Sequence, residues 1–171
     1  MKPGANSACL IEGKQKGTAV ASKLVRIAKA DLEANPGAEW NGFVDLLAVN
    51  DYEDLAPRQR AAHLVFWYES EVQNGGHLQF FSNPSGERAD ETVSALAGIG
   101  APAHAEVLRR ALARWRARPR LPRAEADDYA AVALEGEFDE LDRAFHNCGI
   151  TLVEVLQRHL AEHWSDFILR E

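Results

Sequence analysis

The 171-residue sequence has few of the features that mark secreted or membrane proteins. Its two cysteines, Cys9 and Cys148, are too few and too far apart to indicate a disulfide-rich secreted domain. No stretch approaches the roughly 18 consecutive apolar residues of a membrane-spanning helix. The N-terminal segment has only the short apolar run 8–11, too short for a signal peptide. We therefore expect a cytoplasmic protein with reduced thiols and no membrane partner.

Positive charge is also scarce. The chain has 19 Lys and Arg residues against 26 Asp and Glu, which gives a formal net charge of −7. This surplus disfavours direct binding to nucleic acid and is compatible with a basic protein partner. The length and the 46% hydrophobic content are those of one globular domain with a sizeable core.

The two signs of charge are separated along the second half of the chain. Seven arginines and no acid lie in residues 109–123, and eight acids and no base lie in residues 124–142. Two explanations stay open: the blocks pair with each other, or the carboxylates form a surface that binds a basic partner. The acids of this acidic block are Glu125, Asp127, Asp128, Glu135, Glu137, Asp139, Glu140 and Asp142.

Apolar residues recur at helical spacing through most of the chain, and no segment alternates as a strand would. The pattern predicts an all-α protein, a single compact bundle of about seven or eight helices, in one domain over residues 18–171. Residues 1–17 are expected to form a mobile tail. The predicted helices include 18–35, 40–55, 56–73, 85–102, 103–115, 124–134, 137–147 and 150–169.

The stretch EVQNGGHLQFFSNPSGE, residues 71–87, places two glycines between apolar segments. It has neither the lysine, the preceding strand nor the glycine spacing of a phosphate loop. A bend fits better, because Asn and Gly enter left-handed backbone conformations at little cost. We expect Asn74 to end the long helix and Gly75 to take the left-handed cap position. Gly76 would then let another backbone segment pass close by.

The residues around the glycines extend this interpretation. A short helix over 77–82 would direct two phenylalanines into the core, and polar side chains would satisfy backbone groups at the bend. The set, called here the elbow motif, is Glu71, Asn74, Gly75, Gly76, Gln79, Phe80, Phe81 and Asn83. Its expected role is mainly structural. A pocket at Asn74, Gln79 and Asn83 that binds a small molecule is the alternative.

The pattern E-V-x-N-G-G-x-x-Q-F-F-x-N-x-x-G, from Glu71 to Gly86, resembles the signature of the bacterial DNA-mimic protein family named after a neisserial member. The resemblance covers about residues 40–168, through ALAGIGAP (95–102) and HLAEHWSDF (159–167). It implies an all-α, homodimeric protein without enzymatic activity or cofactor. The namesake role is to place carboxylates where DNA would place phosphates on the DNA-binding surface of a transcription regulator. His77 is a departure, since the family more often has an aromatic or apolar residue there.

The acidic block has part of the charge density that such a role requires. A helix of 19 residues is about 28 Å long, and duplex DNA of that length carries about 16 phosphates. The eight carboxylates supply half of that number, and a dimer would bring two blocks together. Mimicry is therefore permitted by the charge count and not required by it.

One further motif has the spacing of a metal site. HLAEH, residues 159–163, matches the H-x-x-E-H pattern of one class of zinc proteases, with His159 and His163 one helical turn apart. Those enzymes also need an acidic ligand well downstream, and only eight residues follow His163. We predict no metal site and no cofactor. Our main hypothesis is an acidic interaction protein that binds a DNA-binding regulator. Two hypotheses compete with it: an enzyme that uses this helix or the elbow motif, and a scaffold that self-associates through its charged blocks.

Overall fold

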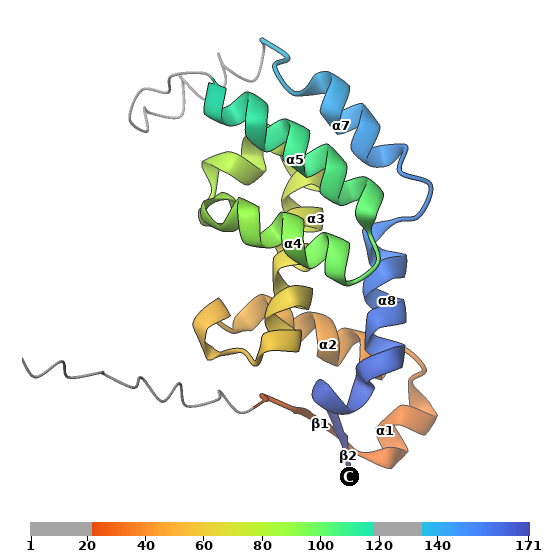
Figure 1. Cartoon of the computed structure of the whole chain (residues 1–171). Coiled ribbons are helices and arrows are strands. Elements are labelled where there is room, and N and C mark those ends of the chain that lie inside the picture. Colours follow the sequence, from red (N-terminus) through yellow and green to blue (C-terminus); the bar gives the residue numbers. More distant parts are fainter. Residues whose placement is uncertain (1–21, 118–134) are drawn as a thin grey trace, which may run out of the picture.

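The computed structural model describes residues 22–117 and 135–171. Within them the chain folds into a compact, almost entirely helical bundle with one two-stranded sheet (Figure 1). The all-α fold class is confirmed. The predicted tail 1–17 and the predicted helix 124–134 lie outside the described residues.

The α-helices are α1 (Lys29–Ala34), α2 (Ala38–Val49), α3 (Pro57–Ser82), α4 (Ala89–Gly98), α5 (Pro102–Ala117), α7 (Asp139–His146) and α8 (Leu152–His163). The 3-10 helices are η1 (Tyr52–Asp54), η2 (Pro84–Arg88) and η3 (Trp164–Asp166), and the strands are β1 (Val25–Ile27) and β2 (Ile168–Arg170).

Helix α3 runs through the centre of the bundle and contacts α2, α4, α7 and α8 (Figure 1). It begins with Pro57, whose fixed φ suits the first helical turn. Its core side chains Ala62, Val65 and Tyr68 have no exposed surface. The prediction that this helix forms the centre of the core is correct, and so is the predicted bend: the helical conformation is interrupted at Gly75 and Gly76 and resumes over residues 77–82.

The helix predicted over 18–35 is wrong in the described part of its first half. Residues Val25–Ile27 form β1, which pairs in parallel with β2, Val25 lying opposite Ile168. The last predicted helix, 150–169, ends at His163 and is followed by η3 and β2. β-branched residues at three of these six strand positions fit extended backbone. The absence of a side chain at Gly42 lets β1 pack closely against α2, since a Cβ there would lie 2.9 Å from Cγ1 of Val25.

Gln59 ties both strands to α3. Its side chain is fully buried, and its Nε2 donates to the main-chain oxygens of Lys23 (2.6 Å) and Asp166 (2.8 Å). Its Oε1 accepts from the main-chain N–H groups of Ala56 (3.1 Å) and Lys23 (3.3 Å). One amide side chain thus satisfies four main-chain groups from three segments.

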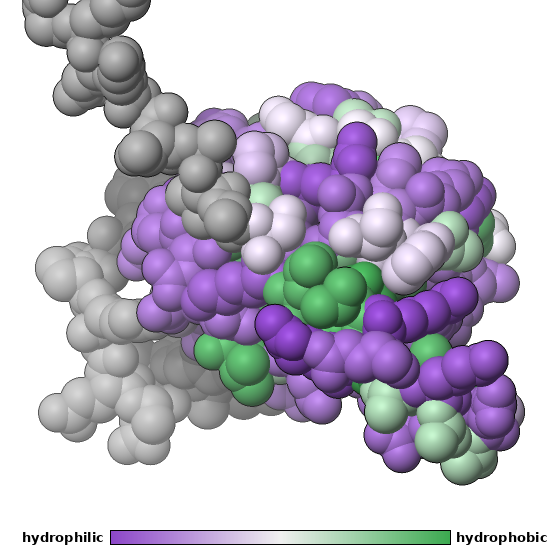
Figure 2. Space-filling model, turned by 90° about the horizontal axis from the view of Figure 1, so that it is seen from below, coloured by the Kyte–Doolittle hydropathy of each residue, from purple (hydrophilic) through white to green (hydrophobic). Residues whose placement is uncertain are grey.

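Within residues 22–117 and 135–171, no helix has both the length and the apolarity to cross a membrane. Figure 2 shows the molecule from below, the end at which Figure 1 places the sheet and α1: a small group of hydrophobic residues is surrounded by hydrophilic ones. The large hydrophobic side chains that are exposed in the described residues are Leu24, Val49, Trp164 and Leu169.

Candidate functional site

The elbow motif lies inside α3, where two glycines leave the helical conformation. Gly75 has φ −155° and ψ 26°, and Gly76 has φ 71° and ψ −173°. The second combination is open essentially only to glycine. The left-handed residue is therefore Gly76, and the prediction that Gly75 takes that conformation is wrong. Helix α3 continues from His77 to Ser82, with Phe80 and Phe81 buried.

The space beside Gly76 is filled by a side chain from another helix. A Cβ at Gly76 would lie 2.5 Å from Oδ2 of Asp142, a residue of α7. The predicted close approach thus exists, but it involves a carboxylate and not a backbone segment. This contact brings α7 against the elbow.

Glu71 is the centre of the polar side chains at the bend. Its Oε2 accepts hydrogen bonds from Gln79 Nε2 (2.6 Å) and Asn83 Nδ2 (2.7 Å), and Asn74 Nδ2 donates to Gln79 Oε1 (3.0 Å). These side chains bond to one another, so the expectation that they satisfy stranded backbone groups is wrong. They hold a carboxylate that is only 9% exposed.

His77 has no exposed surface and connects the two parts of α3, before and after the glycines, with α7. Its Nδ1 and its main-chain N–H lie 2.5 Å and 2.9 Å from Oδ1 of Asp142, and its Nε2 lies 2.9 Å from the Tyr68 hydroxyl. Because a carboxylate only accepts, Nδ1 donates to Asp142, and Nε2 shares the second hydrogen bond of the ring with the Tyr68 hydroxyl. Asp142 thus supplies the acceptor that a fully buried polar ring needs at this position.

The acidic block is only partly available as a surface. Its first three members, Glu125, Asp127 and Asp128, lie outside the described residues. Asp142 bonds to His77, which removes it from the predicted partner surface. Glu140 pairs with Arg110 (3.0 Å) and Arg114 (3.7 Å) of α5.

The side chain of Glu140 is therefore used in pairing between the acidic block and the basic block. Asp139 has a different environment, with 64% of its side chain exposed and a 3.8 Å ion pair to Arg143 on its own helix. Glu135 and Glu137 precede α7, and the main-chain oxygen of Glu137 accepts from Arg114 (2.8 Å). Within α7, therefore, Glu140 pairs with another helix, whereas Asp139 faces outward.

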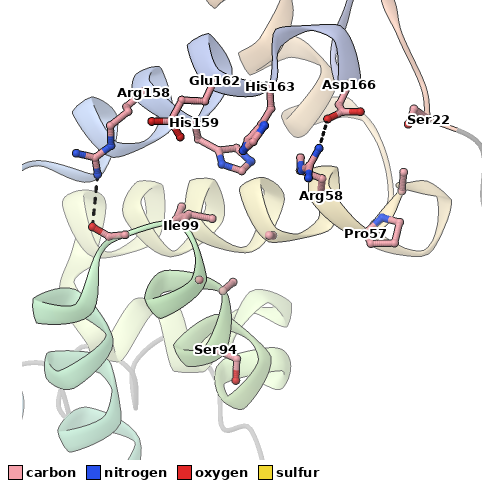
Figure 3. Close-up of a pocket in the computed structure, with 15 residues that line it drawn as sticks. Ser22, Pro57, Arg58, Ser94, Ile99, Arg158, His159, Glu162, His163 and Asp166 are labelled. Atoms are coloured by element: carbon pink, nitrogen blue, oxygen red, sulfur yellow. Dashed lines mark hydrogen bonds and ion pairs between the residues drawn. The ribbon is translucent and has the colours of Figure 1, made fainter.

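The histidines of HLAEH line an open groove of about 970 Å³ between α8, α3 and α4 (Figure 3). The His159 and His163 rings meet edge to face, 4.9 Å between centroids. Figure 3 shows Arg58 paired with Asp166 at one end and Arg158 directed at the Gly100 oxygen at the other. Burial, with His163 and Arg58 nearby, lowers the pKa of His159. Among the described residues no three potential ligands come close enough to hold a metal ion.

A smaller cavity of about 360 Å³ lies beside the elbow motif. It is lined by Glu71, His63 and Trp67 of α3, by the end of α2 with η1, and by η2. Burial lowers the pKa of His63, whose Nδ1 lies 3.0 Å from the Leu47 oxygen. This site was not predicted from the sequence. The available signal was the spacing of residues 63, 67 and 71, which repeats every four residues and predicts one helix face.

The chain matches a known protein family over most of its length. A family model described as "DMP19-like protein" matches residues 53–164. No curated protein and no solved structure matches the chain. The matched region runs from η1 to the start of η3, so it contains the elbow motif, the acidic block and α8, and leaves out both strands.

Proposed function

Since the chain belongs to the DMP19-like family, we propose that it is a non-enzymatic acidic interaction protein, a DNA mimic that occupies the DNA-binding surface of a transcription regulator or a similar basic protein. Carboxylates on its exterior would take the places of DNA phosphates. The proposed role requires no cofactor and no direct contact with nucleic acid. We further propose that it acts in the cytoplasm as a homodimer, which would double the number of carboxylates presented to the partner.

The distribution of charge is the observation that carries this proposal. Residues 22–117 and 135–171 contain 22 acids and 13 Lys and Arg residues, a net charge of −9. The remaining residues contain four acids and six Lys and Arg residues, a net charge of +2. The described part of the chain is therefore more acidic than the chain as a whole, as a protein that attracts a basic surface requires.

A second acidic surface supports the proposal. Glu53 and Glu91 both pair with Arg88, which brings η1 beside the start of α4. Tyr52 adds a hydrogen bond from its hydroxyl to Glu91 (2.5 Å). The carboxylates gathered here, called the η1–α4 carboxylates, are Asp51, Glu53, Asp54, Glu87, Asp90 and Glu91, all exposed.

The ion pairs within this surface do not prevent partner binding. Asp90 pairs with Arg116 and Asp54 with Lys23, each through exposed side chains. Exposed pairs of this kind contribute about 0–1 kcal/mol each. Arginines and lysines of a partner can therefore replace them at small cost.

Capture of DNA-binding proteins from native lysate tests the proposal. We expect the wild-type chain to retain such proteins at about 0.1 M salt and to release them at about 0.5 M, because exposed charges are screened over a shorter distance at higher salt. Added duplex DNA should compete for the same proteins. Capture that neither salt nor duplex DNA reduces would contradict the proposal.

Charge-neutralised variants show which group of carboxylates binds the partner. One variant replaces Glu125, Asp127, Asp128, Glu135, Glu137, Asp139 and Glu140 by their amides and keeps Asp142, which the fold uses. A second replaces the η1–α4 carboxylates in the same way. The control carries Asp31→Asn and Glu33→Gln, two exposed acids of α1. At least one of the first two should lose capture, and the control should keep it.

A further inference from the structure

We propose that the cavity beside the elbow motif binds one cationic group, a guanidinium or an alkylammonium, which pairs with the carboxylate of Glu71. The inference rests on the proposed function, because a basic protein partner supplies such groups as arginine and lysine side chains. The cavity would then receive a single side chain of the partner while the exposed carboxylates around it make the broader contact.

Glu71 has the environment of a carboxylate that lacks its counter-ion. The residue is only 9% exposed, and its Oε2 is held by the neutral amides of Gln79 and Asn83. Its other oxygen, Oε1, has no hydrogen bond or ion pair with any described residue. A buried carboxylate is costly unless a positive charge neutralises it. The two amides fix its orientation, and the cavity provides the space from which a cation can reach it.

The other side chains lining the cavity also favour a hydrogen-bond donor with positive charge. Burial lowers the pKa of His63 and so favours the neutral ring, in which Nδ1 donates to the Leu47 oxygen and Nε2 is an acceptor. Trp67 supplies an aromatic ring, which attracts cations. Tyr52 already has the guanidinium of Arg60 5.0 Å and that of Arg88 4.0 Å from its ring centroid.

Arg88 is the one cation among the described residues that line this cavity. It pairs with Glu53 and Glu91 and not with Glu71, so it leaves the Glu71 carboxylate uncompensated. Asp51 lines the cavity from an exposed position, and the side chain of Val49 beside it is 78% exposed. An acidic and apolar rim of this kind suits the alkyl stem and charged head of an arginine or lysine.

Titration of the full chain with blocked amino acids tests the proposal. The ligands are N-acetyl-arginine amide, N-acetyl-lysine amide and, as neutral analogue of arginine, N-acetyl-citrulline amide. The readout is the set of NMR amide signals from residues 49–52 and 85–88, which also shows whether each variant is folded. We expect saturable shifts with the two cations and none with the citrulline compound.

Variants connect the binding to Glu71. Glu71→Gln should weaken binding of the arginine compound by about tenfold or more, because it removes the charge that the cation pairs with. Trp67→Leu, which leaves Glu71 in place, should weaken it by about threefold through loss of the aromatic face. Glu33→Gln, the same chemical change on exposed α1, should leave it unchanged. Binding of the citrulline compound as tight as that of the arginine compound, or unchanged binding in both cavity variants, would overturn the proposal.

Two further arms identify the source of the cation. Free arginine and spermidine are titrated in parallel, and binding of either one about tenfold tighter than the blocked residues would overturn the assignment to a partner side chain. The titration needs no partner protein, and the capture experiment tests the exposed carboxylates, which the Glu71 variant leaves unchanged. Failure of this inference and failure of the proposed function are therefore distinguishable.

Discussion

Gly76 fixes the geometry of the elbow. Its φ of 71° with ψ of −173° is a conformation that residues with a side chain avoid. The carboxylate of Asp142 occupies the place where a Cβ would project, and the same carboxylate holds His77. A side chain at this position would strain the backbone and displace the bond between α3 and α7.

Gly76→Ala should lower the free energy of unfolding by about 2–4 kcal/mol, since backbone strain adds to a disturbed buried hydrogen bond. Urea denaturation followed by circular dichroism measures the change. Gly98→Ala is the matched control, because Gly98 lies in α4 and a methyl group added there would have no atom within 4 Å. That change should be neutral or stabilise by up to about 1 kcal/mol. Equal losses in both variants would show that the elbow conformation is not the cause.

Residue preferences predicted the elbow but not its details. Asn74-Gly75-Gly76 marks a bend because these residue types tolerate unusual φ values. Which glycine takes the left-handed conformation depends on Asp142, 66 residues further along the chain, and no local pattern contains that information. The cavity was missed for the same reason, since η1, α3 and η2 each contribute only part of it.

Among the elements, the two strands depend most on contacts made by others. Each has three residues, and Gln59 bonds to the main chain just before each of them, at Lys23 and Asp166. Glu171 and Lys29 complete the pairing through main-chain hydrogen bonds at its far end. The sheet is therefore held at both ends, with α3 as its support.

Gln59→Ala should lower the free energy of unfolding by about 3 kcal/mol, because four main-chain groups lose their partner in a buried site. Amide exchange of residues 25–27 and 168–170 should become faster than that of the α3 core. Gln157→Ala, at an exposed position of α8, is the control and should change stability by less than about 0.5 kcal/mol. Unchanged exchange in the strands of the Gln59 variant would contradict the assigned role.

The helices were predictable from the chain itself, whereas the sheet was not. Apolar residues at helical spacing place α3, α5 and α8 close to their observed starts. Val25 pairs with Ile168, 143 residues away, so nothing in residues 18–35 distinguishes a strand from the start of a helix. Three-residue strands are also too short to show an alternating pattern.

At the scale of the whole molecule, histidines that are wholly or partly buried make stability depend on pH. Burial lowers the pKa of His63, His104 and His159 below the ordinary value of 6.5. Between pH 6.5 and these lowered values the unfolded chain binds protons that the native chain does not. Stability is therefore fully present above pH 6.5 and declines as the pH falls through this range.

The temperature of the unfolding midpoint should accordingly decrease as the pH is lowered from about 7.5 to about 5. Most carboxylates begin to titrate only near about pH 4, below this range. His104→Leu removes one of the three groups while keeping an apolar side chain beside Phe145, 5.1 Å away between ring centroids. Its midpoint should fall less over the same range. A decline as steep as that of the wild type would exclude His104 as a contributor.

The parallel pairing of β1 with β2 has a consequence for biosynthesis. Residues 25–27 leave the ribosome early, but their hydrogen-bonding partner is residues 168–170, which are translated after every helix of the bundle. Until then the edge of β1 has no strand beside it, and closing so large a loop is slow. Nascent chains stalled before residue 168 should thus hold an assembled helical core with an unpaired β1, a form that chaperones and proteases of the cell would meet first.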